Sequence, residues 1–211
     1  MAPKKPIKNS SKSTSKTHSS SPKKENKVSF WKKINFFIND ERTHFILGLL
    51  FLLIMLYFLL AFVSYFFTGY ADQSKIDLSW SELHQMRNSI QNWTSVLGAI
   101  TAETLINRWF GVSSFFILFF GIVVALRLMK AVKLSLWKTF FHCAFWLIWL
   151  SVTLGFVFSP FYNNVLFFSL GGQHGDYASQ WLTSYIGVPG TLMVIIGTLL
   201  IYCIISFNSA L

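Results

Sequence analysis

The sequence predicts an all-α membrane protein, in which four transmembrane helices and short interfacial helices follow a disordered basic N-terminal tail. Three observations predict this class. Four stretches of about 20 residues contain no charged side chain, and a helix of about that length crosses the hydrocarbon of a bilayer. Only 12% of the 211 residues are charged, whereas a water-soluble domain carries about a quarter. Eleven of the 18 Lys and Arg residues precede Phe45, so the net charge of +10 belongs to a tail rather than to a folded nucleic-acid-binding face.

The N-terminal 29 residues consist almost entirely of Lys, Ser, Pro, Thr and Asn. Because such a segment buries too little surface to offset its ordering entropy, we expect residues 1–29 to form a disordered cytoplasmic tail. Its lysines act either as a solvated topology signal or by attraction to anionic lipid headgroups, worth about 1 kcal/mol per basic residue. The pattern of residues 30–42 then predicts an interfacial amphipathic helix. Its apolar positions, at helical spacing, are Phe30, Trp31, Ile34, Phe37 and Ile38.

A four-span membrane domain is predicted for residues 43–207. Pro160 ends the third span, and Pro189 lies in the first turn of the fourth, where its missing N–H does little harm. Ser79 and Glu82 have the spacing of a capping box, which predicts a short helix in the connection between the first two spans. The predicted spans are residues 45–67, 109–126, 139–158 and 186–207.

The distribution of basic residues predicts the orientation of the spans. The residues before Phe45 and the loop from Arg127 to Lys138 together hold 15 of the 18 Lys and Arg residues. Since the cytoplasmic loops of membrane proteins are enriched in Lys and Arg, both termini should be cytoplasmic and the other two loops external. The same distribution supports four spans, because an additional or missing span would put a basic segment on the wrong side.

The predicted spans lack the groups that ion transport or catalysis needs. No Asp, Glu, Lys or Arg falls within them, whereas proton relays and ion pathways require ionisable side chains inside the membrane. Glu103 has no second carboxylate, nucleophile or metal ligand near it in the sequence, so we expect it to pair with Arg108 or with a polar group on a neighbouring helix. The histidines are scattered, and Cys143 and Cys203 are interpreted as packing residues. We therefore expect no catalytic, cofactor-binding or metal site.

Small residues recur at helix-packing intervals. Ser151, Gly155 and Ser159 are four positions apart in the third span, and Gly98 and Ala102 are four apart before the second. Such spacing lets helix backbones approach closely, either within one protomer or between protomers. The predicted packing and assembly positions are Gly98, Ala102, Gly111, Ser151, Gly155, Ser159 and Gly190.

Two segments, in order along residues 43–207, resemble the N-terminal membrane domain of the FtsK/SpoIIIE DNA translocases. The first segment runs into the second span, and the second precedes an amphipathic stretch and a last span that begins Gly187-Val188-Pro189-Gly190. The basic tail and the long first external loop are similar to the version found in Bacteroidetes-type bacteria. The residues that carry the resemblance are Asn92, Gly98, Ala99, Ala102, Glu103, Leu105, Phe110 and Gly111 in the first segment, and Gly171, Gly172 and Gly175 in the second.

The resemblance implies a membrane anchor in the bacterial cytoplasmic (inner) membrane, at the division septum. Its members carry a cytoplasmic hexameric motor that pumps chromosomal DNA with ATP, and their membrane domain helps to assemble the division machinery. The implied partners are the lipid bilayer, further copies of the chain (a hexamer through the motor) and membrane proteins of the septum.

These 211 residues hold no glycine-rich phosphate loop ending in Lys and Ser or Thr, so we expect no enzymatic activity from this chain alone. ATP, magnesium and DNA are expected only for a C-terminal motor outside it. We expect the chain to be a truncated or separated membrane domain.

A stand-alone four-helix permease or small-molecule transporter is the alternative function. It would need a polar, water-accessible cavity at the middle of the membrane. A pocket ringed by Ser151, Ser159 and other polar groups would favour transport, whereas an apolar bundle would favour the anchor.

Overall fold

The computed structural model describes residues 41–76, 78, 80–159 and 167–208. The predicted tail at residues 1–29 and the predicted amphipathic helix at residues 30–42, apart from its last two residues, lie outside these ranges. Every regular element in the described ranges is a helix, and four are long and apolar enough to cross a membrane, so the predicted fold class is confirmed. The elements are α2 (Glu41–Ile76), α3 (Trp80–Gln85), η1 (Arg87–Ser89), α4 (Ser95–Ala102), η2 (Glu103–Phe110), η3 (Gly111–Ser114), α5 (Phe115–Leu128), α6 (Leu136–Phe158) and α7 (Gly172–Asn208).

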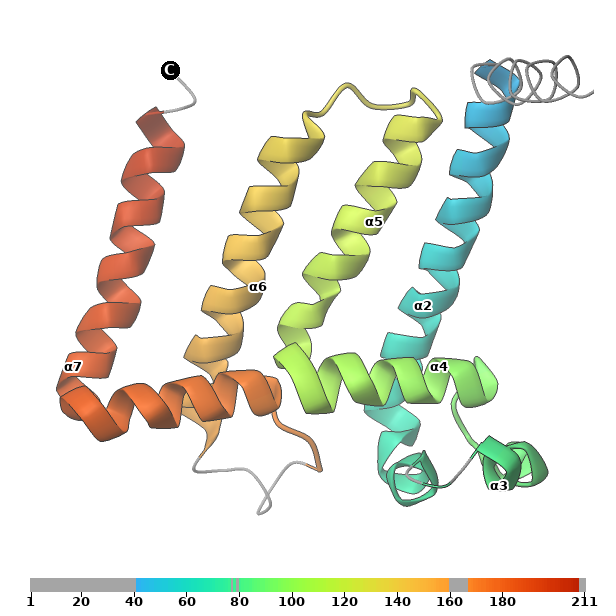
Figure 1. Ribbon diagram of the computed structural model, residues 1–211, viewed down its shortest axis with the longest axis horizontal. Coiled ribbons are helices and arrows are strands. Elements are labelled where there is room, and N and C mark those ends of the chain that lie inside the picture. Colours follow the sequence, from blue (N-terminus) through green and yellow to red (C-terminus); the bar gives the residue numbers. More distant parts are fainter. Residues whose placement is uncertain (1–40, 77, 79, 160–166, 209–211) are drawn as a thin grey trace, which may run out of the picture. The chain divides into compact units, whose positions relative to one another are not determined.

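Four upright helices stand side by side in Figure 1, namely α2, α5, α6 and the C-terminal part of α7. α2 packs against α5, α5 against α6, and α6 against α7. Only 11% to 39% of the most apolar window in each candidate span is buried within the protein. Large apolar side chains therefore cover the outside of these helices, as expected where lipid rather than water is the solvent.

Two pairs of upright helices, α2 with α5 and α6 with α7, are each joined through a helix that lies across them. The first transverse helix, residues 95–110, consists of α4 and η2 and leads into α5. The second transverse helix, residues 172–186, is the N-terminal part of α7. Both lie horizontally in Figure 1, at the end opposite the α5–α6 connection. The chain thus repeats one plan twice: an upright helix, a connection, a transverse helix and a second upright helix.

A glycine with positive φ turns each transverse helix into the upright helix that follows. Gly111 has φ 70° and ψ −149°, and Gly187 has φ 72° and ψ 171°. A Cβ atom makes this region costly for any other residue. Space is also short at Gly111, where a Cβ would collide with the Leu170 carbonyl oxygen, whereas at Gly187 the nearest atom would be Pro189 Cδ at 3.7 Å.

The buried core lies where the first transverse helix crosses α2. Side chains from α2, the transverse helix, α5 and the segment before α7 meet there, and aromatic rings fill most of the space. Phe62 packs edge-on against Phe115 with ring centroids 5.4 Å apart. The cluster comprises Ala61, Phe62, Tyr65, Ala102, Ile106, Leu118 and Phe168.

The helices extend beyond the predicted spans. α2 continues past Phe67 to Ile76, and Trp109, where the second span was predicted to begin, still belongs to the first transverse helix. An apolar run predicts which residues lie in the hydrocarbon of the bilayer, but it does not predict where the helix ends. The helix continues for as long as its backbone hydrogen bonds are made. The end of α2 therefore projects past the apolar run and carries a buried acid, Asp72.

Alanine substitution at Gly111 and Gly187 should show how much backbone strain and steric collision each contribute to the loss of stability. Gly187→Ala should lower the free energy of unfolding by about 1–3 kcal/mol, the cost of a backbone conformation that is essentially restricted to glycine, in an open site. Gly111→Ala should cost at least about 3 kcal/mol, because overpacking adds to the same strain. Unfolding of the purified chain in detergent micelles measures both.

Gly197→Ala is the control for these two variants. Gly197 lies inside the upright part of α7, and a Cβ there would meet no atom within 4 Å. It should leave stability unchanged or raise it by about 0.5–1 kcal/mol through helix propensity. A Gly111→Ala variant no less stable than Gly187→Ala would contradict the close approach to Leu170.

Candidate functional site at the transverse helices

Glu103 is a buried carboxylate on the first transverse helix, with only 2% of the residue exposed. The Tyr65 hydroxyl of α2 donates a hydrogen bond to Glu103 Oε2 at 2.7 Å, and Asn107 Nδ2 donates to Oε1 at 2.8 Å. The half-exposed Arg108 brings its Nε to 4.0 Å from Oε1. Both kinds of partner expected from the sequence, Arg108 and a polar group on a neighbouring helix, are therefore present. A buried charge is costly without such partners, and the bond from Tyr65 also holds the transverse helix to α2.

A second buried acid, Asp72 at the end of α2, fixes the start of the same transverse helix. Its two carboxylate oxygens accept the backbone N–H groups of Gln91 and Asn92, each at 2.8 Å. The Asn92 side chain donates to the Ala61 carbonyl at 3.1 Å and accepts from the Thr94 N–H at 3.0 Å. Asn92 is thus a structural link between α2 and the start of α4, and it satisfies backbone groups that a helix start leaves unpaired.

Sequence reasoning missed the α2 side of this junction. No role was assigned to Asp72 or Tyr65 from the sequence. A signal was present, because Ala61, Ser64, Tyr65 and Asp72 recur at helical spacing and share one face of α2. Ser64 uses its hydroxyl to accept the backbone N–H of residue 93 at 3.0 Å, so every polar member of this face binds the transverse helix or the turn before it.

The two segments that carry the family resemblance meet in space. The backbone N–H of Val112 donates to the Leu170 carbonyl at 2.9 Å. A Cβ on Gly111 would strike the Leu170 carbonyl, and one on Gly172 would strike the Trp109 carbonyl. Gly172 itself has φ 67°. Glycine at both positions therefore permits a backbone-to-backbone contact that side chains would prevent.

Glycines also join α6 to the second transverse helix. A Cβ on Gly155 would collide with the backbone of Gly175, and a Cβ on Gly171 or Gly175 would collide with the backbone at Ser151. Ser151 is fully buried, and its hydroxyl donates to the Gly171 carbonyl at 2.6 Å. Ser151 and Gly155 thus pack within one protomer, one of the two alternatives that the sequence left open.

The remaining predicted positions have different surroundings. Ala99 and Ala102 are buried, and a Cβ on Gly98 would come within 3.0 Å of Ala61 Cβ on α2. Ser159 accepts a hydrogen bond from Gln180 Nε2 at 3.2 Å. Gly190 lies beside the Ile186 side chain, across the bend at Gly187 rather than against another helix. A role in assembly between protomers stays a prediction for all of them.

The start of the second transverse helix carries two ionisable side chains whose pKa values are shifted by burial. Burial raises the pKa of Asp176, an effect that a hydrogen bond from Ser169 opposes, and burial lowers the pKa of His174. The His174 ring packs 5.0 Å from that of Phe110, which ends the first transverse helix. Asp176 Oδ1 is buried and has no hydrogen-bond partner in the described part of the chain.

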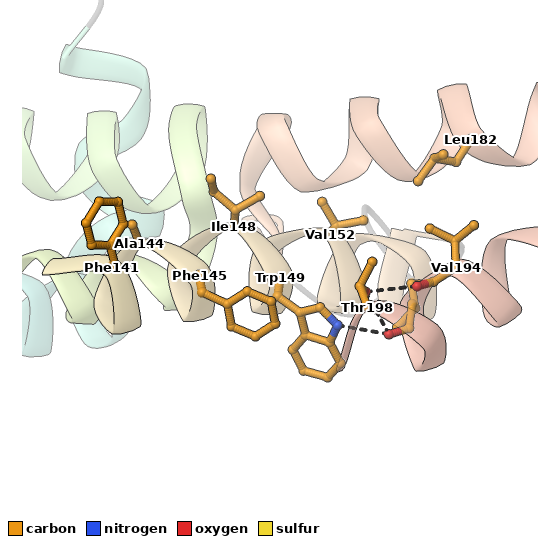
Figure 2. Close-up of a pocket in the computed structure, with 10 residues that line it drawn as sticks. Phe141, Ala144, Phe145, Ile148, Trp149, Val152, Leu182, Val194 and Thr198 are labelled. Carbon is orange, nitrogen blue, oxygen red and sulfur yellow. Dashed lines mark hydrogen bonds between the residues drawn. The ribbon is translucent and has the colours of Figure 1, made fainter. Parts of the chain in front are cut away.

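An apolar groove of about 450 Å³ lies between α6 and α7, as Figure 2 shows. Its hydroxyl group, on Thr198, donates to the carbonyls of Val194 and Ile195 in its own helix at 2.8 and 3.0 Å. The Trp149 indole donates to the Ile195 carbonyl at 3.0 Å. Polar atoms in the groove are therefore already paired within the protein. The other lining residues are Phe141, Ala144, Phe145, Ile148, Val152 and Leu182.

Ser159 lines a different pocket of about 530 Å³ at the end of α6, and Ser151 lines neither of these two. The polar ring of both serines that a transporter would need is thus not formed by either pocket. Among the residues that the structure describes, no three His, Cys, Asp or Glu side chains are placed to hold a metal ion.

Comparison with known proteins gives one consistent result. A family model described as the 4TM region of DNA translocase FtsK/SpoIIIE matches residues 40–211. A curated protein of Shewanella oneidensis, named DNA translocase FtsK, is 31% identical over 143 residues, which are 66% of this chain and 15% of the relative. The chain therefore corresponds to a small part of that relative's length. No solved structure matches the chain.

Removal of the Tyr65 hydroxyl should destabilise the protein, because the buried Glu103 carboxylate then loses a hydrogen-bond donor. Tyr65→Phe should lower the free energy of unfolding by about 2 kcal/mol, because a hydrogen bond to a charged group is lost and Glu103 remains buried. Tyr70→Phe is the matched control: Tyr70 lies on the same helix with 78% of its surface exposed, and its variant should change stability by less than about 0.5 kcal/mol. Unfolding in detergent micelles compares the two.

A double-mutant cycle with Glu103→Leu, which removes the acceptor, should give a coupling energy of about 1–2 kcal/mol between the two positions. Equal losses from Tyr65→Phe in the presence and absence of Glu103 would mean that the hydrogen bond does not hold the transverse helix.

Proposed function

Because this chain belongs to the family of four-transmembrane regions of the FtsK/SpoIIIE DNA translocases, we propose that it anchors such a translocase at the division septum and helps to assemble it there. One observation carries the proposal: the two segments that bear the family pattern meet at Gly111 and Gly172, so the pattern corresponds to a single structural unit. In this proposal the unit is a membrane platform, and the chemistry belongs to a motor outside this chain.

The arrangement of the chain ends supports this role. Figure 1 places the start of α2, the α5–α6 connection and the end of α7 at one end of the upright helices. Arg127, Lys130, Lys133 and Lys138 lie in or beside that connection. Since basic loops face the cytoplasm, the end of α7 would lie on the cytoplasmic side of the membrane, where a motor could be attached. ATP, magnesium and DNA would then be bound by the motor, and the platform would contact lipid, further copies and septal membrane proteins.

The apolar groove between α6 and α7 supports an anchor over a permease, and the polar pocket at Ser159 lies at the end of α6 rather than at its middle. The groove between α6 and α7 is apolar in the middle of the upright helices, and its hydroxyl and indole groups are already bonded. A solute that crosses a membrane needs polar or ionisable groups along its path. The buried acids Glu103 and Asp72 are bound to backbone and side-chain donors at the transverse helix instead.

A fluorescent fusion of the chain, expressed in its own host, tests the septal role. The fusion should concentrate at the division site, and it should do so when residues 1–29 are scrambled at constant composition, because the family match covers residues 40–211. Fluorescence microscopy of dividing cells measures septal enrichment, with the same reporter on an unrelated four-span protein as the control. Uniform fluorescence of the unscrambled fusion around the membrane would count against the anchor.

Cysteine labelling tests the proposed orientation. With Cys143 and Cys203 replaced by alanine, Asn88→Cys in η1 should react with a membrane-impermeant maleimide in intact spheroplasts. Leu134→Cys in the basic loop, at a residue that is 50% exposed, should react only after the membrane is permeabilised. The reverse labelling pattern would place the end of α7 on the outer side, where no cytoplasmic motor can be attached.

A further inference from the structure

A basic pocket of about 450 Å³ lies at the end of the upright helices opposite the transverse helices, between the start of α2 and the α5–α6 connection. We propose that this pocket binds the headgroup phosphate of an anionic phospholipid. The inference does not depend on a septal role; it requires only that these helices cross a membrane. The lining residues are His44, Arg127, Leu128, Lys130, Val132 and Lys133.

The turn that builds the pocket is a Schellman motif, the usual left-handed end of a helix. Lys130 N–H donates to the Arg127 carbonyl at 3.0 Å, and Ala131 N–H donates to the Leu126 carbonyl at 2.9 Å. Lys130 occupies the left-handed position with φ 59°. Glycine is the usual residue there, because any other residue strains the backbone. A lysine in this position adds a positive charge to the pocket at the expense of local stability.

Positive charge in the pocket is incompletely compensated. Lys130 Nζ lies 2.5 Å from Glu41 Oε1, but both side chains are mostly exposed, and an exposed ion pair gains little. In the described part of the chain, neither Arg127 nor Lys133 forms an ion pair. One Arg127 nitrogen, Nη1, donates to the Val132 carbonyl at 3.4 Å, which folds the loop around the guanidinium and leaves its other donors available. Two exposed cations and a third in a weak pair therefore surround one cavity.

The surroundings of the pocket select a lipid over a soluble anion. Phe45, Leu134 and Trp137 lie within a few residues of the lining positions in sequence, and they are 50%, 50% and 74% exposed. A phospholipid can place its phosphate among the cations and its acyl chains along such apolar side chains, whereas a soluble phosphate gains only the first contact. Basic pockets between membrane helices at the cytoplasmic surface bind anionic headgroups in this way.

The close approach of α2 to α5 holds the pocket together. A Cβ on the buried Gly48 would lie only 2.6 Å from Met129 Cγ and 2.9 Å from the Ala125 carbonyl oxygen. His44 is one helical turn before Gly48, so the same contact brings it to the loop. The cavity is thus part of the packed helix pair rather than a chance fold of the surface.

Native mass spectrometry of the delipidated full chain tests the proposal, with phosphatidylglycerol and phosphatidylcholine as the two probes. The wild-type chain should bind one phosphatidylglycerol more tightly than phosphatidylcholine. Lys133→Gln and Lys130→Gly should each weaken phosphatidylglycerol binding about fivefold, the effect of one basic residue at a membrane surface. Lys138→Gln is the matched control, because Lys138 is exposed near the same end of α6 but does not line the pocket, and it should change binding less than twofold.

Lys130→Gly also separates binding from folding. It removes the left-handed strain, so its thermal unfolding without lipid should occur at or above the wild-type temperature while lipid binding falls. Equal binding of the two lipids, wild-type binding by both pocket variants, or an equal loss in Lys138→Gln would each overturn the proposal. Displacement of phosphatidylglycerol by millimolar inorganic phosphate would indicate a soluble anion site, and displacement by duplex DNA a nucleic-acid site; either result overturns it as well.

Discussion

The backbone contact between Gly111 and the segment from Leu170 to Gly172 is the constraint on which the rest of the structure depends. At this point the first transverse helix ends, the second begins, and the Val112 N–H binds the Leu170 carbonyl. In a bilayer, association of helices relies on close packing and hydrogen bonds, because lipid tails are as apolar as the side chains that they replace. Glycines, which have no side chain, therefore let the two halves of the chain approach each other closely. The contacts of Gly155, Gly171 and Gly175 extend this close packing toward α6.

Buried acids supply the second constraint. Glu103 and Asp72 are each almost fully buried, and together they bind donors from α2, from η2 and from the turn before α4. Bonds of this kind are directional, so they set the angle of the first transverse helix as well as its position. A platform fixed by directional bonds at one end suits the proposed task of holding a motor, since a tether must resist the pull of its load.

The two ends of the upright helices carry different structural features. The transverse helices and the buried acids occupy one end, while the other holds the basic loop, the strained Lys130 and the ends of α2 and α7. In our proposal, positive charge at this second end both orients the chain in the membrane and retains an anionic lipid. Orientation and anchoring would then use the same few side chains, at the end to which a motor would be joined.

The sequence by itself determined the class, the four membrane-crossing helices and the family, because apolar length, charge placement and glycine spacing are local properties that lipid as a solvent enforces. It also indicated that Glu103 would be paired. Tertiary structure alone decided that Tyr65 is its partner, that Asp72 binds Asn92, and that Val112 binds Leu170. The partner of a buried polar group depends on which helix crosses it, and that crossing is set by packing between residues that are 20 to 60 positions apart. Periodicity along one segment carries no information about such a crossing.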